Sequence, residues 1–322
     1  MNILFTTYCN LNCPYCFARN KLFSLRGSKI QYISLSMLKL VINFIKRSRK
    51  TSVGILGGEP TLYPRFKKAI QMVLDSGLEI QLFSNGIIKK ENVAFLNKID
   101  RSMCEILINI NNPEFYSPHD WRIINYVLKT LQNRVSLGFN IHSTQVDMGF
   151  LLLLIKKYRL KKQIRLGMSL PVIGDDNTYL HLTVYRRITE KIIKFAKHCD
   201  KMDTVIIFDC GFRLCDFTEE ECGRLAYFNS PLISHCRMPI DVGPDLTVWP
   251  CFVTSKLWNK KLTDFNNIKE IREFYINRIK QFKLLGTKNN CLKCKYLRRG
   301  QCSGGCLGHI FKQLNIKNLY NR

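Results

Sequence analysis

Three cysteines at spacing C-x3-C-x2-C lie near the start of the chain: Cys9, Cys13 and Cys16. They follow a short apolar segment, 2–6, that predicts a strand, so we expect them on a loop. A zinc site would use four protein ligands or keep an open position, and no further cysteine or histidine follows within roughly eighty residues. Three soft thiolates can instead hold a [4Fe-4S] cluster and leave one iron for another ligand. The spacing predicts such a cluster and not three buried structural cysteines.

A second group of cysteines lies in the last third of the chain. Its members are Cys210, Cys215 and Cys222, then Cys236 and Cys251 separated by fourteen residues, and finally the compact block Cys291, Cys294, Cys302 and Cys306. A zinc ribbon on the compact block is one interpretation, although the separation within the block is short. Disulfides are disfavoured in a reducing compartment. Further iron–sulfur clusters fit this glycine-rich segment best, and we expect it to have little secondary structure.

The first two hundred residues alternate strand-like and helix-like patterns. Predicted strands cover 2–6, 52–56, 79–83, 105–110, 135–141, 163–170 and 204–208, and predicted helices cover 34–49, 65–76, 91–98, 119–132, 148–158 and 183–198. Ser34 is the expected N-cap of the first of these helices. This βα succession predicts an α/β fold with a parallel sheet and right-handed crossovers.

Three of the predicted strands alternate between apolar residues and small or polar ones. The second set comprises Asn109, Asn111, Ser136, Gly138, Asn140, His142, Arg165, Gly167 and Ser169. Successive side chains of a strand point to opposite faces, so helices cover the apolar face and the other face is polar. A closed barrel packs its interior with branched apolar residues. The pattern therefore favours a partial barrel that encloses a ligand.

Two polar turns follow predicted strands. Gly57-Gly58-Glu59-Pro60 comes after the second strand, and Ser84-Asn85 comes after the third. Glycines let a backbone approach a partner closely, and Glu59 could accept hydrogen bonds from an ammonium group. An ordinary Asn-Gly turn is the alternative for Ser84-Asn85.

These features together resemble the radical S-adenosylmethionine (SAM) superfamily. Its signature is C-x3-C-x-aromatic-C, with Tyr15 in the aromatic position, and the turn at 57–60 is similar to its GGEP motif. The resemblance implies a six-stranded partial (β/α) barrel over residues 1–208. It also implies that the unique iron chelates SAM, which is cleaved by one electron to a 5′-deoxyadenosyl radical that abstracts hydrogen from a substrate.

The resemblance also implies cofactor-binding residues, of which Tyr15 lies within the cysteine motif itself. The methionyl amino group of SAM would contact Gly57, Gly58 and Glu59. Ser84 and Asn85 would lie near its ribose and carboxylate. The ribose hydroxyls could also form hydrogen bonds with Asn109 and Asn111. Arg165 could pair with the SAM carboxylate, with a structural ion pair as the alternative.

Residues 209–322 resemble the SPASM/twitch extension of this superfamily, which carries auxiliary [4Fe-4S] clusters. The chain departs from that pattern in three ways: seven residues separate Cys294 from Cys302 instead of five, Leu246 replaces a glycine, and no cysteine follows Cys306. A missing ligand would come from Cys210 or Cys215. We therefore expect one or two auxiliary clusters, with two as the preferred number. We interpret Cys104 and Cys199 as core residues and leave the role of Cys222 open between the core and the cysteine-rich segment.

In this subgroup the substrates are mostly peptides and protein side chains, so we predict a radical oxidation or cross-link on a peptide. Asp209, at the end of the last predicted strand, is the candidate general base, with an ion-paired or capping aspartate as the alternative. His142 is a second candidate. A dehydrogenase acting on a sugar or cyclitol is the alternative enzyme, and a nucleic-acid-binding or nucleic-acid-modifying protein is the alternative of another class.

Composition and charge bear on the partners. The net charge of +26 would attract an anionic partner, but the basic residues are spread along the chain, and the aromatic and basic interleaving of a nucleic-acid platform is absent. We expect no nucleic acid, no membrane span and no export signal, and thus a cytoplasmic protein. With the cluster motif beginning at residue 9, a peptide substrate would need a separate leader-binding adaptor or direct docking. The resemblance implies flavodoxin or ferredoxin as the electron donor.

Overall fold

The computed structural model describes residues 1–236 and 238–314. Its contacts divide the chain into two compact units. The first contains residues 1–13, 18–135 and 238–276, and the second contains residues 14–17, 136–236 and 277–314. Each unit has strands and helices of its own.

The first unit contains a predominantly parallel sheet. Its strands are β1 (Asn2–Leu4), β2 (Ser52–Leu56), β3 (Glu79–Ser84), β4 (Cys104–Asn109), β8 (Asp241–Val242), β9 (Thr247–Trp249) and β10 (Lys260–Lys261). Strands β1 to β4 pair in parallel in chain order, and β8 pairs in parallel with the other side of β1. Strands β9 and β10 extend the sheet antiparallel from β8. Most apolar residues of the parallel strands β1 to β4 are buried, whereas both lysines of β10 are exposed.

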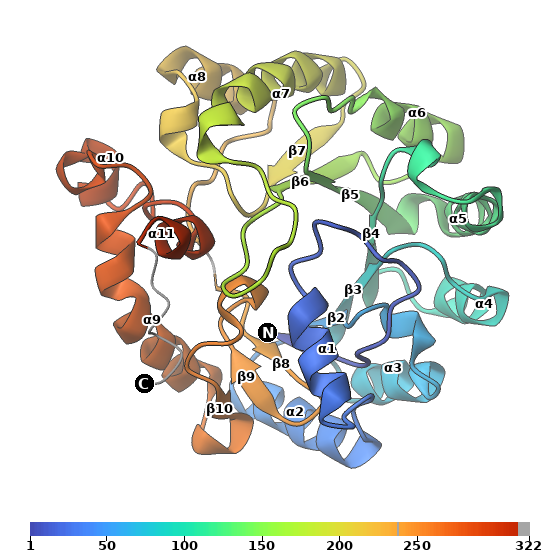
Figure 1. The fold of residues 1–322 in the computed structure, drawn as a ribbon. Helices are drawn as coiled ribbons and strands as arrows, with labels where there is room; N and C mark the ends of the chain where they lie inside the picture. Colours follow the sequence, from blue (N-terminus) through green and yellow to red (C-terminus); the bar gives the residue numbers. More distant parts are fainter. Residues whose placement is uncertain (237, 315–322) are drawn as a thin grey trace. The chain divides into compact units, whose positions relative to one another are not determined.

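The helices of the first unit are α1 (Arg19–Gly27), α2 (Leu35–Arg47), α3 (Phe66–Asp75), α4 (Lys90–Lys98) and α5 (Pro118–Leu131). Helices α2 to α5 lie outside its strands, whereas α1 overlaps the strands in the view of Figure 1. Ser34 caps α2 by accepting a hydrogen bond from the backbone N–H of Met37, which confirms the predicted N-cap. The buried face of α2 carries Leu38, Val41 and Ile45, all fully buried, so burial of one apolar face holds the helix on the sheet.

The second unit contains a three-stranded parallel arrangement. Strands β5 (Val135–Ile141), β6 (Gln163–Met168) and β7 (Val205–Phe208) pair in chain order. The register places Asn140 beside Gly167 and Gly138 beside Arg165, so the predicted polar row is continuous across two strands. Its helices are α6 (Gly149–Tyr158), α7 (Tyr185–Asp200), α8 (Glu219–Tyr227), α10 (Lys295–Arg298) and α11 (Leu307–Gln313), and α9 (Ile268–Leu285) contributes its residues after Ile276.

Every strand and helix predicted in the first 208 residues is present, with ends shifted by one or a few residues. The expectation of little secondary structure in the tail is wrong, because α9 alone has 18 residues and β8 and β9 form a hairpin. Helix α1 was also not predicted, since only Leu22 and Leu25 of its nine residues are buried and the apolar pattern is weak. The domain boundary predicted between residues 208 and 209 stays a prediction.

The β8–β9 turn explains one departure from the family pattern. Leu246 has a φ of +63°, in the left-handed region where glycine is favoured. Its N–H donates to the carbonyl of Gly243 at 3.0 Å, and the N–H of Gly243 donates to Thr247 at 2.8 Å. The chain thus keeps the turn that a glycine would normally occupy. Among the described residues, no helix combines the length and apolar character that crossing a membrane requires.

Asp241 of β8 is a buried carboxylate beside β1. It is 1% exposed and accepts a hydrogen bond from Asn2 Nδ2 at 2.7 Å. Burial raises its pKa to about 7, because a low-dielectric environment disfavours the charged form, while the bond from Asn2 acts in the opposite direction.

The Asp241→Asn variant should have a flatter dependence of stability on pH. Native Asp241 binds its proton more tightly than the unfolded chain does, so this group lowers the free energy of unfolding as pH rises from about 4 until it levels off above about 7. Between pH 6 and pH 8 the loss is about 1.4 kcal/mol. Urea unfolding of wild type and variant at the two pH values measures it, and equal pH dependence of the two proteins would contradict the assignment.

Candidate active site

The backbone of the Gly57-Gly58-Glu59 turn lies directly against the loop that leads into the cysteine motif. The N–H of Gly58 donates to Thr6 O at 2.9 Å, and the N–H of Glu59 donates to Tyr8 O at 2.7 Å. A Cβ on Gly58 would lie 2.1 Å from Tyr8 O, and one on Gly57 would lie 2.7 Å from Thr6 O. Both glycines are therefore needed for backbone-to-backbone packing, which fixes the start of the cysteine loop.

Glu59 is fully buried, and its carboxylate is satisfied by protein donors. It accepts hydrogen bonds from the Thr61 hydroxyl at 2.7 Å, the Asn85 N–H at 2.7 Å, the Ser84 hydroxyl at 3.0 Å and the Thr61 N–H at 3.2 Å. Burial raises its pKa, and these hydrogen bonds oppose that change. Glu59 thus joins the end of β2 to the end of β3, and its side chain positions the turn with Ser84 and Asn85.

Cys9 is exposed on its loop, with polar donors around its sulfur. Asn85 Nδ2 lies 3.7 Å from Cys9 Sγ and 2.7 Å from Asn10 Oδ1, and the Leu11 N–H lies 3.5 Å from Cys9 Sγ. Asn10 in turn donates to the carbonyl of Ile87 at 3.2 Å. Hydrogen bonds to sulfur favour the thiolate and tune a bound cluster. The side chain of Asn85 therefore contacts the cysteine loop directly, at Cys9 and Asn10.

Cys13 is half-buried, and its carbonyl is held by the first residue of α1. Arg19 Nη2 donates to Cys13 O at 2.7 Å. The phenol of Tyr116 is buried and accepts the Asn111 N–H at 2.9 Å, and its pKa is raised to about 12 by burial, with the Cys13 charge adding a smaller contribution. Asn111 is buried, whereas Asn109 is exposed at the end of β4. Of the two predicted ribose contacts, Asn109 has the more accessible side chain.

In the second unit the aromatic residue of the cysteine motif stacks on a histidine. The rings of Tyr15 and His142 lie 4.4 Å apart with an interplanar angle of 20°. His142 Nδ1 lies 3.0 Å from the carbonyl of Asn140, an acceptor, so Nδ1 carries the hydrogen and Nε2 is the accepting nitrogen of the neutral ring. The stack gives Tyr15 a structural partner at the end of β5.

Arg165 and Asp209 form an ion pair with each other. Arg165 Nη2 lies 2.6 Å from Asp209 Oδ2, and both side chains are about one-third exposed, at 31% and 32%. A Cβ on Gly167 would lie 2.7 Å from Asn140 Oδ1 and 3.8 Å from Asp209 Oδ2, so these polar groups crowd round the glycine. The two side chains that were assigned separate roles therefore hold each other in place.

Ser169 follows β6 on the same polar face. It is 4% exposed, and its hydroxyl has no hydrogen-bond partner within the described part of the chain. An unpaired buried hydroxyl costs about 1–3 kcal/mol. Such an atom at a strand end fits a polar face that a ligand completes.

The donor set of the cysteine loop fits an iron–sulfur cluster. Cys9, Cys13 and Cys16 are exposed or half-buried, and thiolates are the ligands that such clusters use. Within residues 1–236 and 238–314, no three or more His, Cys, Asp or Glu side chains gather closely enough for a single metal ion. A cluster does not require that arrangement, because each thiolate binds a different iron atom.

The remaining cysteines differ in exposure. Cys104 and Cys199 are 1% exposed, and burial raises the pKa of each thiol to about 12, which confirms them as core residues. The others are exposed (Cys210, Cys215, Cys236) or half-buried (Cys222, Cys251, Cys291, Cys294, Cys302, Cys306). Accessible thiols are available to a metal centre, whereas the two core thiols are not.

Residues 3–149 match the radical SAM superfamily model. These residues form a radical SAM domain. The predicted superfamily resemblance is confirmed, and members of this superfamily use a [4Fe-4S] cluster and SAM.

Curated relatives match over less than half of this chain. The 7,8-dihydro-6-hydroxymethylpterin dimethyltransferase of Methanocaldococcus jannaschii is 34% identical over 146 residues, which are 43% of this chain and 28% of that protein. The GTP 3′,8-cyclase of Mannheimia succiniciproducens is 23% identical over 137 residues, 42% of this chain and 40% of that protein. The matched region thus spans less than half the length of these relatives.

Solved structures match over nearly the whole chain. Streptococcus suis SuiB bound to the precursor peptide SuiA has a TM-score of 0.68 and 15% identity, covering 97% of this chain and 72% of SuiB. The anSMEcpe structure with bound AdoMet and the Kp18Cys peptide has a TM-score of 0.67 and 17% identity, covering 95% of this chain and 88% of that protein. The likeness confirms the predicted α/β radical SAM fold class.

Sequence reasoning missed two groups that support the site. Arg19 holds the cysteine loop from α1, and its signal was an arginine three residues after Cys16 in a region without a clear helical pattern. Tyr116 lies beside Asn111, and the local sequence gave no reason to connect them. Both depend on contacts that only the folded chain brings together.

The Gly58→Ala variant should lose iron from the cysteine loop. Its Cβ would lie 2.1 Å from Tyr8 O, a backbone atom, so the loop must move, at a cost of at least about 2 kcal/mol. Gly27→Ala is the matched control, because its Cβ meets nothing within 4 Å. Iron per chain and urea unfolding measure both effects. Equal iron content and stability in Gly58→Ala and wild type would contradict this account.

The Ser169→Ala variant should be at least as stable as wild type. It removes a buried hydroxyl without a hydrogen-bond partner, which costs about 1–3 kcal/mol. Ser230→Ala is the control, because that hydroxyl already accepts the Ile206 N–H at 2.8 Å, so its loss should lower stability. Thermal unfolding of the two variants and wild type measures both effects. A loss of stability in Ser169→Ala as large as that in Ser230→Ala would contradict this account.

Proposed function

We propose that this protein is a radical SAM enzyme that abstracts hydrogen from a peptide or protein side chain and so oxidises or cross-links it. The observation that carries this proposal is the extent of the structural likeness. The chain shares its fold over 95–97% of its length with two proteins whose structures contain SuiA and the Kp18Cys peptide. The radical SAM domain alone would not favour a peptide, whereas likeness through the cysteine-rich tail supports one.

We propose Cys9, Cys13 and Cys16 as the ligands of the [4Fe-4S] cluster that binds SAM. When bound, that cluster would supply the one electron for reductive cleavage of SAM to methionine and a 5′-deoxyadenosyl radical, which becomes 5′-deoxyadenosine by taking a hydrogen atom from the substrate. The chain's own residues hold this loop: Gly57 and Gly58 pack against its first residues, and Asn85 donates toward Cys9. Auxiliary [4Fe-4S] clusters on the tail cysteines, including Cys236, Cys251 and Cys306, belong to the same proposal.

We propose Asp209 as the group that accepts a proton from the substrate after hydrogen abstraction. Arg165 lies 2.6 Å from its carboxylate and fixes its orientation. The contact of Arg165 with a SAM carboxylate stays a prediction, since this pairing already occupies one of its nitrogens. Asn109 and Asn111 likewise stay predicted ribose contacts.

A small-molecule substrate is the second candidate. The curated relatives are named as a pterin dimethyltransferase and a GTP cyclase, so their names point away from peptides. Their similarity covers at most 43% of this chain, however, and leaves more than half of it unmatched. The peptide proposal accounts for more of the molecule. The proposal also places the protein in a reducing cytoplasm, with flavodoxin or ferredoxin as the electron donor. The peptide would dock on the protein directly or through a separate adaptor.

Anaerobically reconstituted protein with dithionite should convert SAM to 5′-deoxyadenosine, and the Cys9→Ala/Cys13→Ala/Cys16→Ala variant should not. Three deuterated pools distinguish the substrate classes: a peptide digest, a mixture of sugars and cyclitols, and an RNA hydrolysate. Hydrogen abstraction from a peptide would raise the mass of 5′-deoxyadenosine by about one unit with the first pool alone. Asp209→Asn should retain cleavage of SAM but slow product formation by about 100-fold or more.

The outcomes separate the alternatives. Deuterium from the sugar pool or the RNA pool, and none from peptides, would replace the peptide proposal with the corresponding class. Absence of 5′-deoxyadenosine from wild type under every condition would overturn the radical enzyme itself.

A further inference from the structure

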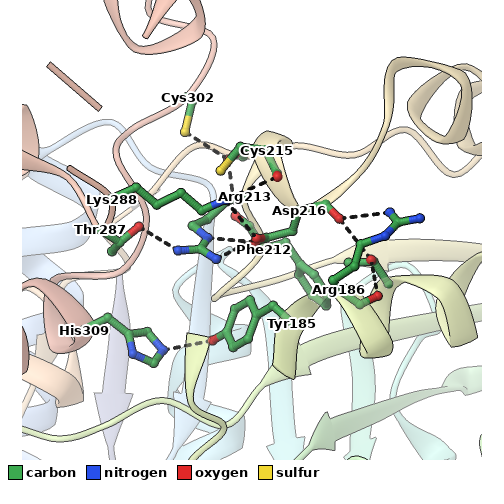
Figure 2. A network of polar contacts seen from close by, with 12 residues as sticks. Tyr185, Arg186, Phe212, Arg213, Cys215, Asp216, Thr287, Lys288, Cys302 and His309 are labelled. Carbon is green, nitrogen blue, oxygen red and sulfur yellow. Dashed lines mark hydrogen bonds and ion pairs between the residues drawn. The ribbon is translucent and has the colours of Figure 1, made fainter. Parts of the chain in front are cut away.

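The segment between β7 and α8 is fastened to the cysteine-rich tail within the second unit. Arg213 is 2% exposed and lies at the centre of this contact (Figure 2). Its Nη2 donates to Asp216 Oδ1 at 2.6 Å, its Nε donates to Asp216 Oδ2 at 2.7 Å, and its Nη1 donates to Thr287 Oγ1 at 2.9 Å. A buried charge is stable only when it is paired and hydrogen-bonded in this way, so the segment and the tail have a fixed mutual placement.

Two further contacts join the same pieces of chain. Lys288, three residues before Cys291, lies with its Nζ 3.5 Å from the carbonyl of Cys215. Ser234 Oγ lies 3.2 Å from the carbonyl of Phe212 and 3.4 Å from Cys302 Sγ. The segment 212–216 is therefore held at both of its ends to residues that neighbour the compact cysteine block.

A cavity of about 460 Å³ lies between this segment and the tail. Its walls include Cys215 from the segment and Cys222 from α8, together with Ser234, Tyr296 and Gln301. In the sequence, Tyr296 follows Cys294 by two residues and Gln301 directly precedes Cys302. Thiols from upstream of the block thus line the same space as residues of the block itself.

The backbone around Cys291 is packed too closely for a side chain at Gly286 or Gly304. A Cβ on Gly286 would lie 2.5 Å from Cys291 Cβ, and one on Gly304 would lie 2.4 Å from Lys283 O. Both glycines have φ near +70°, at +67° and +75°. Lys283 Nζ also donates to the carbonyl of Gly305 at 2.5 Å. A backbone wrapped this closely round cysteines fits a metal centre, and thiols are the donors that an iron–sulfur cluster requires.

Cys210 is held on a different element. Its carbonyl accepts the Met168 N–H of β6 at 3.0 Å, and a Cβ on Gly211 would lie 2.6 Å from Met168 Cβ. This stretch follows β7 directly and pairs with the end of β6, whereas Cys215 lies five residues further, in the segment fastened to the tail.

We propose that Cys215 is the fourth thiolate of an auxiliary [4Fe-4S] cluster whose other thiolates are Cys291, Cys294 and Cys302. The inference rests on the auxiliary clusters of the proposed function and assigns one ligand that the sequence left open. Each of the four thiols would release its proton to solvent and bind one iron through sulfur. Arg213, Lys288 and Ser234 hold the segment that carries Cys215 against the block.

The test uses the full chain carrying Cys9→Ala, Cys13→Ala and Cys16→Ala, so that only auxiliary clusters contribute iron. Into this background Cys215→Ser, Cys210→Ser and Cys222→Ser are introduced singly. Iron and acid-labile sulfide are counted after anaerobic reconstitution, and the reduced clusters are recorded by electron paramagnetic resonance. Cys215 is exposed, so its replacement should leave folding unchanged, which circular dichroism checks.

Cys215→Ser should lose between about one and four iron per chain and alter one cluster signal, because a cubane cluster contains four iron atoms. Cys210→Ser and Cys222→Ser should match the background protein. Unchanged iron and spectra in Cys215→Ser would overturn the assignment, as would the same loss in Cys210→Ser or Cys222→Ser instead. A background protein that binds no iron would overturn it too.

Failure of the proposed function is recognised separately, in protein with the first three cysteines intact. Wild type that cleaves SAM, together with an unaffected Cys215→Ser variant, would remove only the Cys215 assignment. Wild type that never forms 5′-deoxyadenosine would remove the radical enzyme, whatever the auxiliary iron content.

Discussion

The contact between the Gly57-Gly58-Glu59 turn and the cysteine loop is the constraint on which the first unit's site depends. Two backbone segments approach within hydrogen-bonding distance at the end of β2, and a side chain at either glycine would push them apart. The buried carboxylate of Glu59 extends this contact to the end of β3, where the donors belong to Ser84 and Asn85. Asn85 then returns to the loop through Cys9 and Asn10. The loop is therefore positioned by neighbouring strand ends, which a parallel sheet brings to one edge.

The cysteine-rich tail is also held in place by a buried ionisable side chain. In the second unit a buried arginine replaces the buried carboxylate, and its partners come from segments far apart in sequence, at Asp216 and Thr287. Buried charge is costly without such partners, so the network specifies one arrangement of the segment and the block. In both units glycines allow close backbone packing, and a buried ionisable side chain determines which segments pack.

Much of the fold could be predicted, because parallel strands and amphipathic helices have strong periodic signatures. Strand β2 and the Ser34 cap of α2 agree with prediction to the residue. Helix α1 has only two buried apolar residues, so its pattern was too weak. The hairpin β8–β9 joins β1 across more than two hundred residues, and local sequence carries no signal of such a partner. The candidate site was likewise predictable only in part. The spacing of the cysteines identified Cys9, Cys13 and Cys16, whereas no sequence pattern predicted that Arg165 pairs with Asp209.

The crowding at Gly58 also has an evolutionary consequence. A site where any added carbon would strike the main chain of another segment tolerates almost no single substitution, and a compensating change in that other segment cannot remove a carbonyl. An exposed strand side chain of the same sheet, such as Gln81, meets no such restriction from a neighbouring backbone. The architecture separates an inherited, nearly immutable part from a part that is free to diversify.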